Sequence, residues 1–392
     1  MKKILFLIPS LAGIGGTERM VVALSRLVSN AGFDVSIASF DPPDAQPFFK
    51  CDVPFRPMGA IPRLPLPLRA SAYWIAIRKL RALKKKLGTD LTISNLWGAD
   101  LISILSGGPD RKLCVAHISV VDNPTNRLMM RLRPFVAWVY RNADRVIAVS
   151  QPLAVELKAL YRIDDGRIAS IDNFVDRPEA IPYWTEDGIQ RFVWCGRAVA
   201  EKNLEGLLAI WARFAAGRDG VQLVLLGDGP LLGTEVSGAR DLGLSVSTSL
   251  HDRAAQVIFA GKVSRPADYL VCARAMLLTS HAEGLPMVLL EALSLGIPIL
   301  ASDCPSGGVR AAMRAGHVAD TAGPLPGFLL QVPVATEEPG IKAWCDALSS
   351  IASDDSLHAE CVRTALVRAE DFGSERASQR WVAELSRLAA TR

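Results

Sequence analysis

The sequence lacks the features that mark several common classes of protein. It contains no run of about 18 uninterrupted apolar residues, so no membrane-spanning helix is expected. Its seven cysteines are scattered, odd in number and without a spacing typical of zinc sites, which favours a reducing compartment. It contains no Asp-x-Asp pair, the arrangement with which many enzymes hold a divalent ion on a diphosphate, so no metal is expected.

The composition that is present is typical of a folded protein with large cores. Half of the 392 residues are hydrophobic and 21% are charged, and the length suggests two domains. The net charge of +4 conceals an asymmetry: residues 1–180 hold 25 Lys and Arg against 16 Asp and Glu (+9), and residues 181–392 hold 19 against 24 (−5). A basic first half indicates an anionic partner such as lipid headgroups, phosphates or nucleic acid.

Short apolar runs, typical of buried parallel strands, alternate with helical patterns along the chain. The first run follows Met1, Lys2 and Lys3 and also resembles a signal peptide, but the Gly-rich loop and the helix that come next favour a strand. The first half is predicted to have strands at 4–8, 35–39, 91–94, 113–117 and 145–149, and helices that include 18–31 and 133–142. The second half is predicted to have strands at 191–195, 221–226, 257–260, 275–279 and 297–301, and helices at 204–214 and 287–295.

This alternation predicts an α/β protein with two tandem Rossmann-like, doubly wound domains that face each other across a cleft. Residues 172–188 have little apolar periodicity and carry two prolines, so they are interpreted as a linker. The first domain is predicted over 1–178 and the second over 185–373. The amphipathic C-terminal helix, 374–392, is expected to pack back on the first domain.

The most informative segment, 280–298, follows a predicted strand and opens a helix. Gly284 and Pro286 keep the chain out of the helix at first, so Glu283 lies on the loop and Glu291 within the helix. A carboxylate near a helix N-terminus can accept two hydrogen bonds from hydroxyl groups, which suits a sugar or a ribose. The alternative interpretation is a helix cap at Glu283 and a solvated Glu291.

Two further loops follow predicted strands and offer groups for an anion. Arg197 and Lys202 come after the strand at 191–195 and are cations suited to an anionic group, although an unrelated surface pair is the alternative. Gly15 and Gly16 stand before a helix, where backbone N–H groups can approach a phosphate closely. This loop is not a G-x-G-x-x-G, so no dinucleotide cofactor is expected.

His117 ends the strand predicted at 113–117 and would face the crevice at the carboxyl edge of the sheet. A lone histidine is more often a structural residue, so position is the argument for function here. Asp122 follows closely and is a weaker candidate to orient an acceptor.

Together these motifs resemble those of family 4 glycosyltransferases, a retaining class with the GT-B fold, and the resemblance covers nearly the whole chain. It implies that Glu283 contacts the donor sugar and Glu291 the nucleotide ribose, with Arg197 and Lys202 on the diphosphate. It also implies catalytic roles for these two cations, for Glu283 and for His117, which would hydrogen-bond the donor sugar. The donor-binding residues that it implies are Gly15, Gly16, Arg197, Lys202, Gly261, Lys262, Val263, Glu283, Gly284, Leu285, Pro286 and Glu291.

Three loops refine the resemblance. Gly261–Val263 fits the loop that reads the nucleobase through backbone atoms, and 227–230 fits a Gly-containing turn of the family, although both segments are also ordinary turns. Residues 303–308 resemble a subgroup that transfers N-acetylhexosamine and galactose. That subgroup continues with Pro-Arg-Glu, whereas 308–311 reads Gly-Val-Arg-Ala, and the difference leaves the donor sugar open.

The resemblance implies a hexosyl- or N-acetylhexosaminyltransferase that uses a nucleotide-sugar, with UDP as the expected nucleotide, and a glycan or lipid-linked acceptor. The alternatives are a sugar-nucleotide epimerase of the same fold and a non-enzymatic sugar-nucleotide binding protein. Residues 61–86 and 127–133 interleave aromatic and aliphatic side chains with cations, which predicts contact with an anionic membrane, although a surface helix with an ordinary core face is the alternative. No nucleic-acid partner is expected, because the basic residues do not stand with a stacking platform. The protein is expected to be cytoplasmic and peripheral on the inner face of the cell membrane.

Overall fold

The computed structural model describes residues 2–62, 66–121, 130–184, 187–314 and 324–390, and these form two compact units. The first unit comprises Met1–Ile118, Leu128–Phe174 and Ser374–Arg392, and the second comprises Ser119–Arg127 and Val175–Gly373. Asp122 and part of the predicted membrane segments, 63–65 and 127–129, lie outside the described residues.

The first unit is built on a parallel seven-stranded sheet of order β3-β2-β1-β4-β5-β6-β7. Its central strand β1 (Lys3–Ile8) is a continuous apolar run after Lys3, because helices cover both faces of a parallel sheet. Leu5 and Leu7 of β1 pack with Leu80 of α2 and Ile102 of α3, whereas α1 contacts β1 and β2 through its own apolar stripe. The strands are β1 (Lys3–Ile8), β2 (Asp34–Ser39), β3 (Phe55–Pro57), β4 (Leu91–Asn95), β5 (Arg111–Ala116), β6 (Arg145–Ala148) and β7 (Ile168–Ser170). The helices are α1 (Gly16–Asn30), α2 (Leu66–Leu87), α3 (Trp97–Ser106), α5 (Arg133–Arg141), α6 (Gln151–Tyr161) and α14 (Ser374–Ala390).

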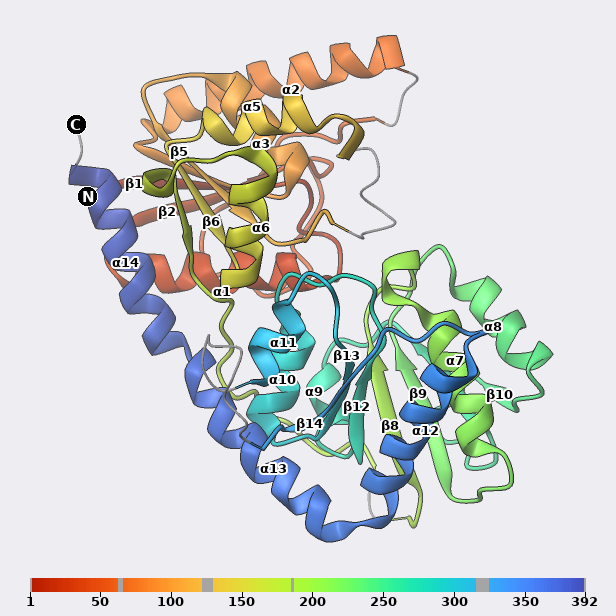
Figure 1. The fold of residues 1–392 in the computed structure, drawn as a ribbon. Helices are drawn as coiled ribbons and strands as arrows, with labels where there is room; N and C mark the ends of the chain where they lie inside the picture. Colours follow the sequence, from red (N-terminus) through yellow and green to blue (C-terminus); the bar gives the residue numbers. More distant parts are fainter. Residues whose placement is uncertain (1, 63–65, 122–129, 185–186, 315–323, 391–392) are drawn as a thin grey trace. The chain divides into compact units, whose positions relative to one another are not determined.

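The C-terminal helix α14 belongs to this first unit and packs against α1 (Figure 1). Its Trp381 and Leu385 are buried, and Glu384 accepts an ion-pair contact of 2.6 Å from Nε of Arg145 on β6. The apolar stripe of a helix is stable only when a partner covers it, and here α1, which is far away in the sequence, helps to provide that cover.

The second unit repeats the architecture with a parallel sheet of order β10-β11-β9-β8-β12-β13-β14. Trp211 of α7 and Trp344 of α12 are buried in one cluster with Phe192 and Trp194 of β8. The strands are β8 (Gln190–Cys195), β9 (Val221–Leu226), β10 (Val246–Ser247), β11 (Val257–Gly261), β12 (Ala275–Leu278), β13 (Ile299–Ser302) and β14 (Gly327–Leu330). The helices are α7 (Leu204–Ala215), α8 (Leu232–Asp241), α9 (Pro266–Leu270), α10 (Met287–Leu295), α11 (Gly308–Met313), α12 (Glu338–Ser353) and α13 (Asp355–Ala369).

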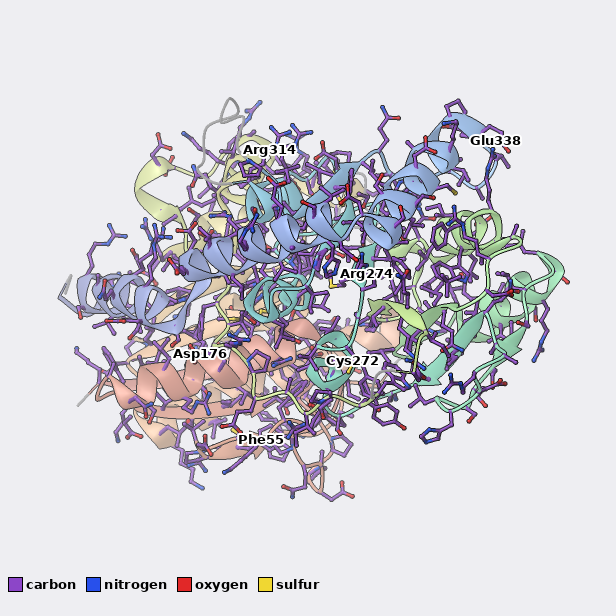
Figure 2. The ribbon with its side chains drawn as sticks, turned by 90° about the horizontal axis from the view of Figure 1, so that it is seen from below. Phe55, Asp176, Cys272, Arg274, Arg314 and Glu338 are labelled. Carbon is purple, nitrogen blue, oxygen red and sulfur yellow. The ribbon has the colours of Figure 1, made fainter. Side chains whose placement is uncertain are left out.

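A partly buried arginine fixes the last two helices of this unit to its sheet. Arg274, just before β12, donates from Nε to the carbonyl of Ile351 in α12 and from its guanidinium to Asp355 at the start of α13, both at 2.7 Å. Figure 2 shows Arg274 at one end of α12 and Glu338, the first residue of that helix, at the other.

Two Rossmann-like domains were predicted and are present, with β9 and α10 at their predicted bounds and α14 beginning at its predicted first residue, Ser374. The strand predicted at 113–117 ends at Ala116, so His117 is the first residue beyond it. The short strands β3, β7, β10 and β14 were not predicted, because each has only two to four residues and none is fully buried.

Candidate active site

In each sheet the strand order reverses at one point, and the loops on either side of that point diverge to opposite faces. In the second unit the reversal lies between β8 and β12, which are adjacent and parallel. The loop after β8 carries Arg197 and Lys202, and the loop after β12 carries Glu283. The topology therefore brings two of the predicted motifs, 81 residues apart, to the same edge of the sheet.

The backbones of these two loops are tied together by hydrogen bonds. Thr279 Oγ1 donates to the carbonyls of Lys202 and Asn203 at 3.2 and 3.1 Å, and the His281 amide donates to Glu201 O at 2.8 Å. Asn203 has a left-handed backbone (φ 50°), and its side chain caps α7 by accepting from the Gly206 amide. Because Asn203 is the N-cap of α7, the helix begins directly after it, and Lys202 is held in the loop just before the helix.

Lys202 and Glu283 form an ion pair at the centre of this arrangement. Lys202 Nζ lies 2.6 Å from Glu283 Oε1, and Ser280 Oγ donates to the same carboxylate oxygen at 2.6 Å. Burial alone would lower the pKa of Lys202, but the Glu283 carboxylate outweighs this and raises the pKa above its usual value. Lys202 is therefore a permanent cation whose position is fixed by its partner.

A third loop, 303–308, is hydrogen-bonded to the loop that carries Glu283. Ser306 Oγ accepts from the Glu283 amide at 3.1 Å, and the Cys304 thiol, whose pKa burial raises to about 12, donates to Ser280 O at 3.1 Å. Gly308 packs so closely that a Cβ there would stand 2.7 Å from the Gly284 carbonyl carbon. Asp303 is bound by Arg310 from Nε at 2.8 Å, so this acid holds the loop together.

Glu291 lies in α10 and is only 3% exposed, with an interaction partner. The alternative of a solvated Glu291 is therefore wrong, and so is a helix cap at Glu283, because the N-cap of α10 is Pro286. Gly284, Leu285 and Pro286 are buried beside it in the loop.

The remaining predicted residues of this unit are more open. Arg197 is exposed and makes no ion pair within the described part of the chain. Lys262 Nζ lies 3.3 Å from Asp228 of the Gly-containing turn, both being exposed, and the Gly227 amide donates to Gly261 O at 2.8 Å. The loops after β9 and β11 are thus joined, and they border the loop after β8 because Gly196 donates to Leu226 O.

The first unit reverses its strand order between β1 and β4. Gly15 is the N-cap of α1, which begins at Gly16, so the Gly-rich loop follows β1 as predicted. The loop is anchored by buried Asp41, which accepts from Ser10 Oγ at 2.5 Å and from the Leu11 amide at 2.7 Å.

His117 stands at the end of β5 and is 9% exposed. Its Nε2 lies 3.0 Å from Oδ1 of Asn95, the last residue of β4, and burial lowers the pKa of His117 to about 4. The imidazole is therefore neutral near pH 7 and acts as a hydrogen-bonding group, not as a cation.

Sequence reasoning missed Asn95, Asp41, Ser280 and Ser306. Asn95 and Ser280 do follow predicted strands, and a polar residue at the carboxyl end of a buried strand was the available signal. Ser306 was noticed only as part of a subgroup motif, and nothing in the sequence places Asp41 under the Gly-rich loop.

Among the described residues, no three His, Cys, Asp or Glu side chains gather as metal ligands, and no described helix is long and apolar enough to cross a membrane.

Comparison with known proteins identifies the family of both units. Residues 14–178 match the model of Glycosyltransferase Family 4, and residues 189–350 match that of Glycosyl transferases group 1. The amylovoran biosynthesis glycosyltransferase AmsD of Erwinia amylovora is 26% identical, over 82% of this chain and 86% of that protein. The lipopolysaccharide 1,6-galactosyltransferase of Salmonella typhimurium is 39% identical, over 53% of this chain and 55% of that protein.

Solved structures show the same fold. Sucrose-phosphate synthase from Thermosynechococcus elongatus aligns over 100% of both chains with a TM-score of 0.78 and 18% identity. The Anabaena protein HepE, in a complex with UDP and glucose, aligns over 98% of this chain and 100% of that one with a TM-score of 0.71 and 17% identity. With matches to both domain models, glycosyltransferase relatives and two Rossmann-like domains, the chain belongs to the family 4 glycosyltransferases of the GT-B fold.

Proposed function

We propose that this glycosyltransferase moves a hexose or N-acetylhexosamine from a UDP-sugar to a glycan or lipid-linked acceptor, with retention at the anomeric carbon, in cell-envelope polysaccharide synthesis. The names of two relatives, an amylovoran biosynthesis enzyme and a lipopolysaccharide galactosyltransferase, support the acceptor class. The complex of HepE with UDP and glucose supports the nucleotide.

The observation that carries the proposal is the ion pair of Lys202 and Glu283 at the strand reversal of the second unit. Cleavage of a nucleotide-sugar places growing negative charge on the diphosphate, and a fixed cation stabilises that charge without reorganising at the moment of reaction. Lys202 has that property because Glu283 holds it protonated and in place. Arg197, exposed on the same loop, adds a second charge with planar donors suited to phosphate oxygens.

Glu283 is assigned to the sugar, because its carboxylate has two oxygens and the bonds from Lys202 and Ser280 both go to Oε1. Glu291 is assigned to the ribose, Gly284, Leu285 and Pro286 to the loop that lies along the donor, and Gly261, Lys262 and Val263 to the base. In the first unit, Gly15 and Gly16 are assigned to phosphate through their backbone, and His117 to a sugar hydroxyl. These are the donor-binding assignments of the proposal.

The reaction follows from these roles. The bond between the anomeric carbon and the diphosphate oxygen breaks with oxocarbenium-like character, and the leaving oxygen keeps the electron pair. The acceptor hydroxyl attacks the same face of the sugar, and a donor phosphate oxygen takes its proton. No side chain forms a covalent intermediate in this scheme.

Membrane contact is proposed for helices of the first unit. Trp74 and Ile75 of α2 are 56% and 49% exposed, and the Arg78 guanidinium lies 4.6 Å from the centre of the Trp74 ring. Phe135 and Trp138 of α5 are 42% and 43% exposed, and Arg131 and Arg133 are exposed at its start. Cations beside exposed aromatic rings suit an anionic headgroup layer.

The test is a panel of UDP- and other nucleotide-sugars, each incubated with and without a lipid-linked acceptor extract. Arg197→Ala is the cleaner variant, because this side chain is exposed and its loss leaves no buried charge. We expect about a 100-fold loss of transfer, comparable with the loss of one donor to a developing anion, with an unchanged melting temperature. Lys202→Ala should lose at least as much activity. This variant leaves the buried Glu283 without its cation, which can destabilise the fold, so its unfolding curve is measured alongside its activity.

Lys342→Ala is the matched control, because this exposed lysine pairs with Asp346, one turn further along the same helix α12, and should leave transfer unchanged. Normal transfer in both Arg197→Ala and Lys202→Ala would refute the diphosphate role. Conversion of the donor to an isomer without acceptor would indicate an epimerase, and binding without any release of nucleotide would indicate a binding protein.

A further inference from the structure

Asn95 joins three strands at the strand reversal of the first unit, and no assignment above gives it a role in the reaction. It is the last residue of β4 and is 1% exposed. Its Nδ2 donates to the carbonyls of Leu7 on β1 and Ile93 on β4 at 3.3 and 3.4 Å, and its Oδ1 lies 3.0 Å from His117 Nε2 beyond β5.

The partners of Asn95 decide the orientation of its amide. Backbone carbonyls only accept hydrogen bonds, so the atom that faces Leu7 O and Ile93 O must be the NH₂ group. The atom that faces His117 is then the amide oxygen, which only accepts. His117 Nε2 must therefore carry a hydrogen, and in a neutral imidazole Nδ1 then carries a lone pair.

His117 Nδ1 is the free end of this chain of bonds. Within the described residues it makes no hydrogen bond, and the ring is neutral near pH 7 because burial depresses its pKa. The imidazole therefore offers one acceptor atom in a fixed direction. A sugar hydroxyl has a hydrogen to donate to such an atom.

The backbone next to Asn95 is strained. Leu96 has φ 71° and ψ 147°, in a region that is unfavourable for any residue with a Cβ, and it is the N-cap of α3. This turn lets the chain pass directly from β4 into α3, and it leaves the Asn95 side chain between β1 and β5. Strain of this kind persists where the surrounding structure fixes it, and it occurs most often at functional sites.

We propose that Asn95 is a positioning residue that holds His117 as the Nε2–H tautomer, so that Nδ1 accepts a hydrogen bond from a hydroxyl of the sugar substrate. The inference rests on the proposed function in one respect, the identity of the substrate. The tautomer itself follows from the contacts of Asn95 alone.

The tautomer is tested first, without any activity assay. Long-range ¹H–¹⁵N spectra report which ring nitrogen of each histidine carries a hydrogen, and the chain has only five histidines. The signal that disappears in His117→Gln belongs to His117. We expect it to show protonated Nε2 and unprotonated Nδ1 at pH 7, and the Nδ1–H population to rise in Asn95→Ala. A wild-type spectrum with protonated Nδ1 would overturn the proposal, and this measurement does not need a variant at position 95.

The second test is a double-mutant cycle on kcat/KM for transfer. We expect Asn95→Ala to lower kcat/KM about tenfold, the factor that corresponds to one net hydrogen bond, and the double variant with His117→Ala to be no worse than His117→Ala alone. A purely structural role would instead give losses that multiply. Ser94→Ala is the control: Ser94 precedes Asn95 in β4, is also buried and donates to Asp100, so its loss should multiply with that of His117→Ala.

The outcomes separate the two proposals. If the wild-type protein transfers no sugar but the His117 tautomer changes in Asn95→Ala, the proposed function fails and the positioning role stands. If transfer is normal in Asn95→Ala, or if the losses of Asn95→Ala and His117→Ala multiply, the positioning role is wrong while the proposed function survives. Thermal unfolding of each variant identifies any loss that comes from misfolding.

Discussion

Substituting alanine for Gly308 should displace the loop that carries Glu283. A Cβ at this position would overlap the carbonyl oxygen of Gly284, and it would lie 2.7 Å from the carbonyl carbon of Gly284 and 3.0 Å from the carbonyl oxygen of Glu283, all of which are backbone atoms. Carbon atoms in contact are about 3.5–4.0 Å apart, and the overlap with the Gly284 carbonyl oxygen is more severe still, so the start of α11 and the Glu283 loop must separate by at least about 1 Å. A flexible side chain could give way to the new methyl group, but these two buried segments cannot.

This displacement should affect both stability and function. Overpacking of this kind typically costs about 1–3 kcal/mol, which lowers the melting temperature of a domain of this size by about 5 °C. A shift of about 1 Å in a group that contacts the reacting substrate can lower kcat about 100-fold. We therefore expect Gly308→Ala to fold, to melt earlier, and to lose most of its UDP-sugar affinity and turnover.

Differential scanning calorimetry measures the change in melting temperature, isothermal titration with UDP measures the change in affinity, and a transfer assay measures the change in turnover. Gly238→Ala in α8 is the matched control, because a methyl group at that position would meet nothing within 4 Å and alanine favours a helix over glycine by about 0.5–1 kcal/mol. That control should melt slightly later and bind UDP normally. The reasoning would be refuted by a Gly308→Ala variant that melts and binds UDP like the wild type.

Two further predictions concern pH. Burial raises the pKa of Asp100 well above its usual value, so the folded state holds a proton that the unfolded state loses above about pH 4. The free energy of unfolding should therefore fall as pH rises, by up to about 1.4 kcal/mol per pH unit relative to that of Asp100→Asn. Urea titrations of the two proteins measure this difference. Burial lowers the pKa of His117 from 6.5 to about 4, so the unfolded state binds more protons in that window. The wild type should lose about 3 kcal/mol relative to His117→Gln between pH 6.5 and 4, and parallel curves for the two proteins would contradict the burial of a neutral imidazole.

The central strands were within reach of sequence reasoning for one physical reason. A parallel strand covered on both faces is a continuous apolar run, and β1 with Leu5, Phe6 and Leu7 is of this kind. The edge strands β3 and β14 are short and only partly buried, so their sequences carry no comparable signal.

The contacts between the candidate site residues could not be predicted from the sequence. Lys202 and Glu283 were each assigned to a ligand, but their 2.6 Å contact depends on β8 lying beside β12, which a linear pattern does not specify. Asn95 was missed for the same reason. An asparagine after an apolar run is indistinguishable from a turn residue until the order β1-β4-β5 places a carbonyl on one side of it and His117 on the other.

The ion pair of Lys202 and Glu283 is difficult to explain by stability alone. Removing two charges from water costs several kcal/mol per ion, and apolar residues of similar size often stabilise a fold equally well or better. The second unit already has a large apolar core on the same sheet, with Trp194, Trp211 and Trp344 fully buried, so its folding does not depend on a polar contact at the strand ends. Under the proposed function, a carboxylate and an ammonium group at the reversal point serve an anionic, hydroxyl-rich ligand: the cation would face the diphosphate, and the carboxylate oxygen that Lys202 and Ser280 do not contact would face hydroxyl groups. The ion pair therefore lies where the proposed ligand, when bound, would offset the cost of its burial.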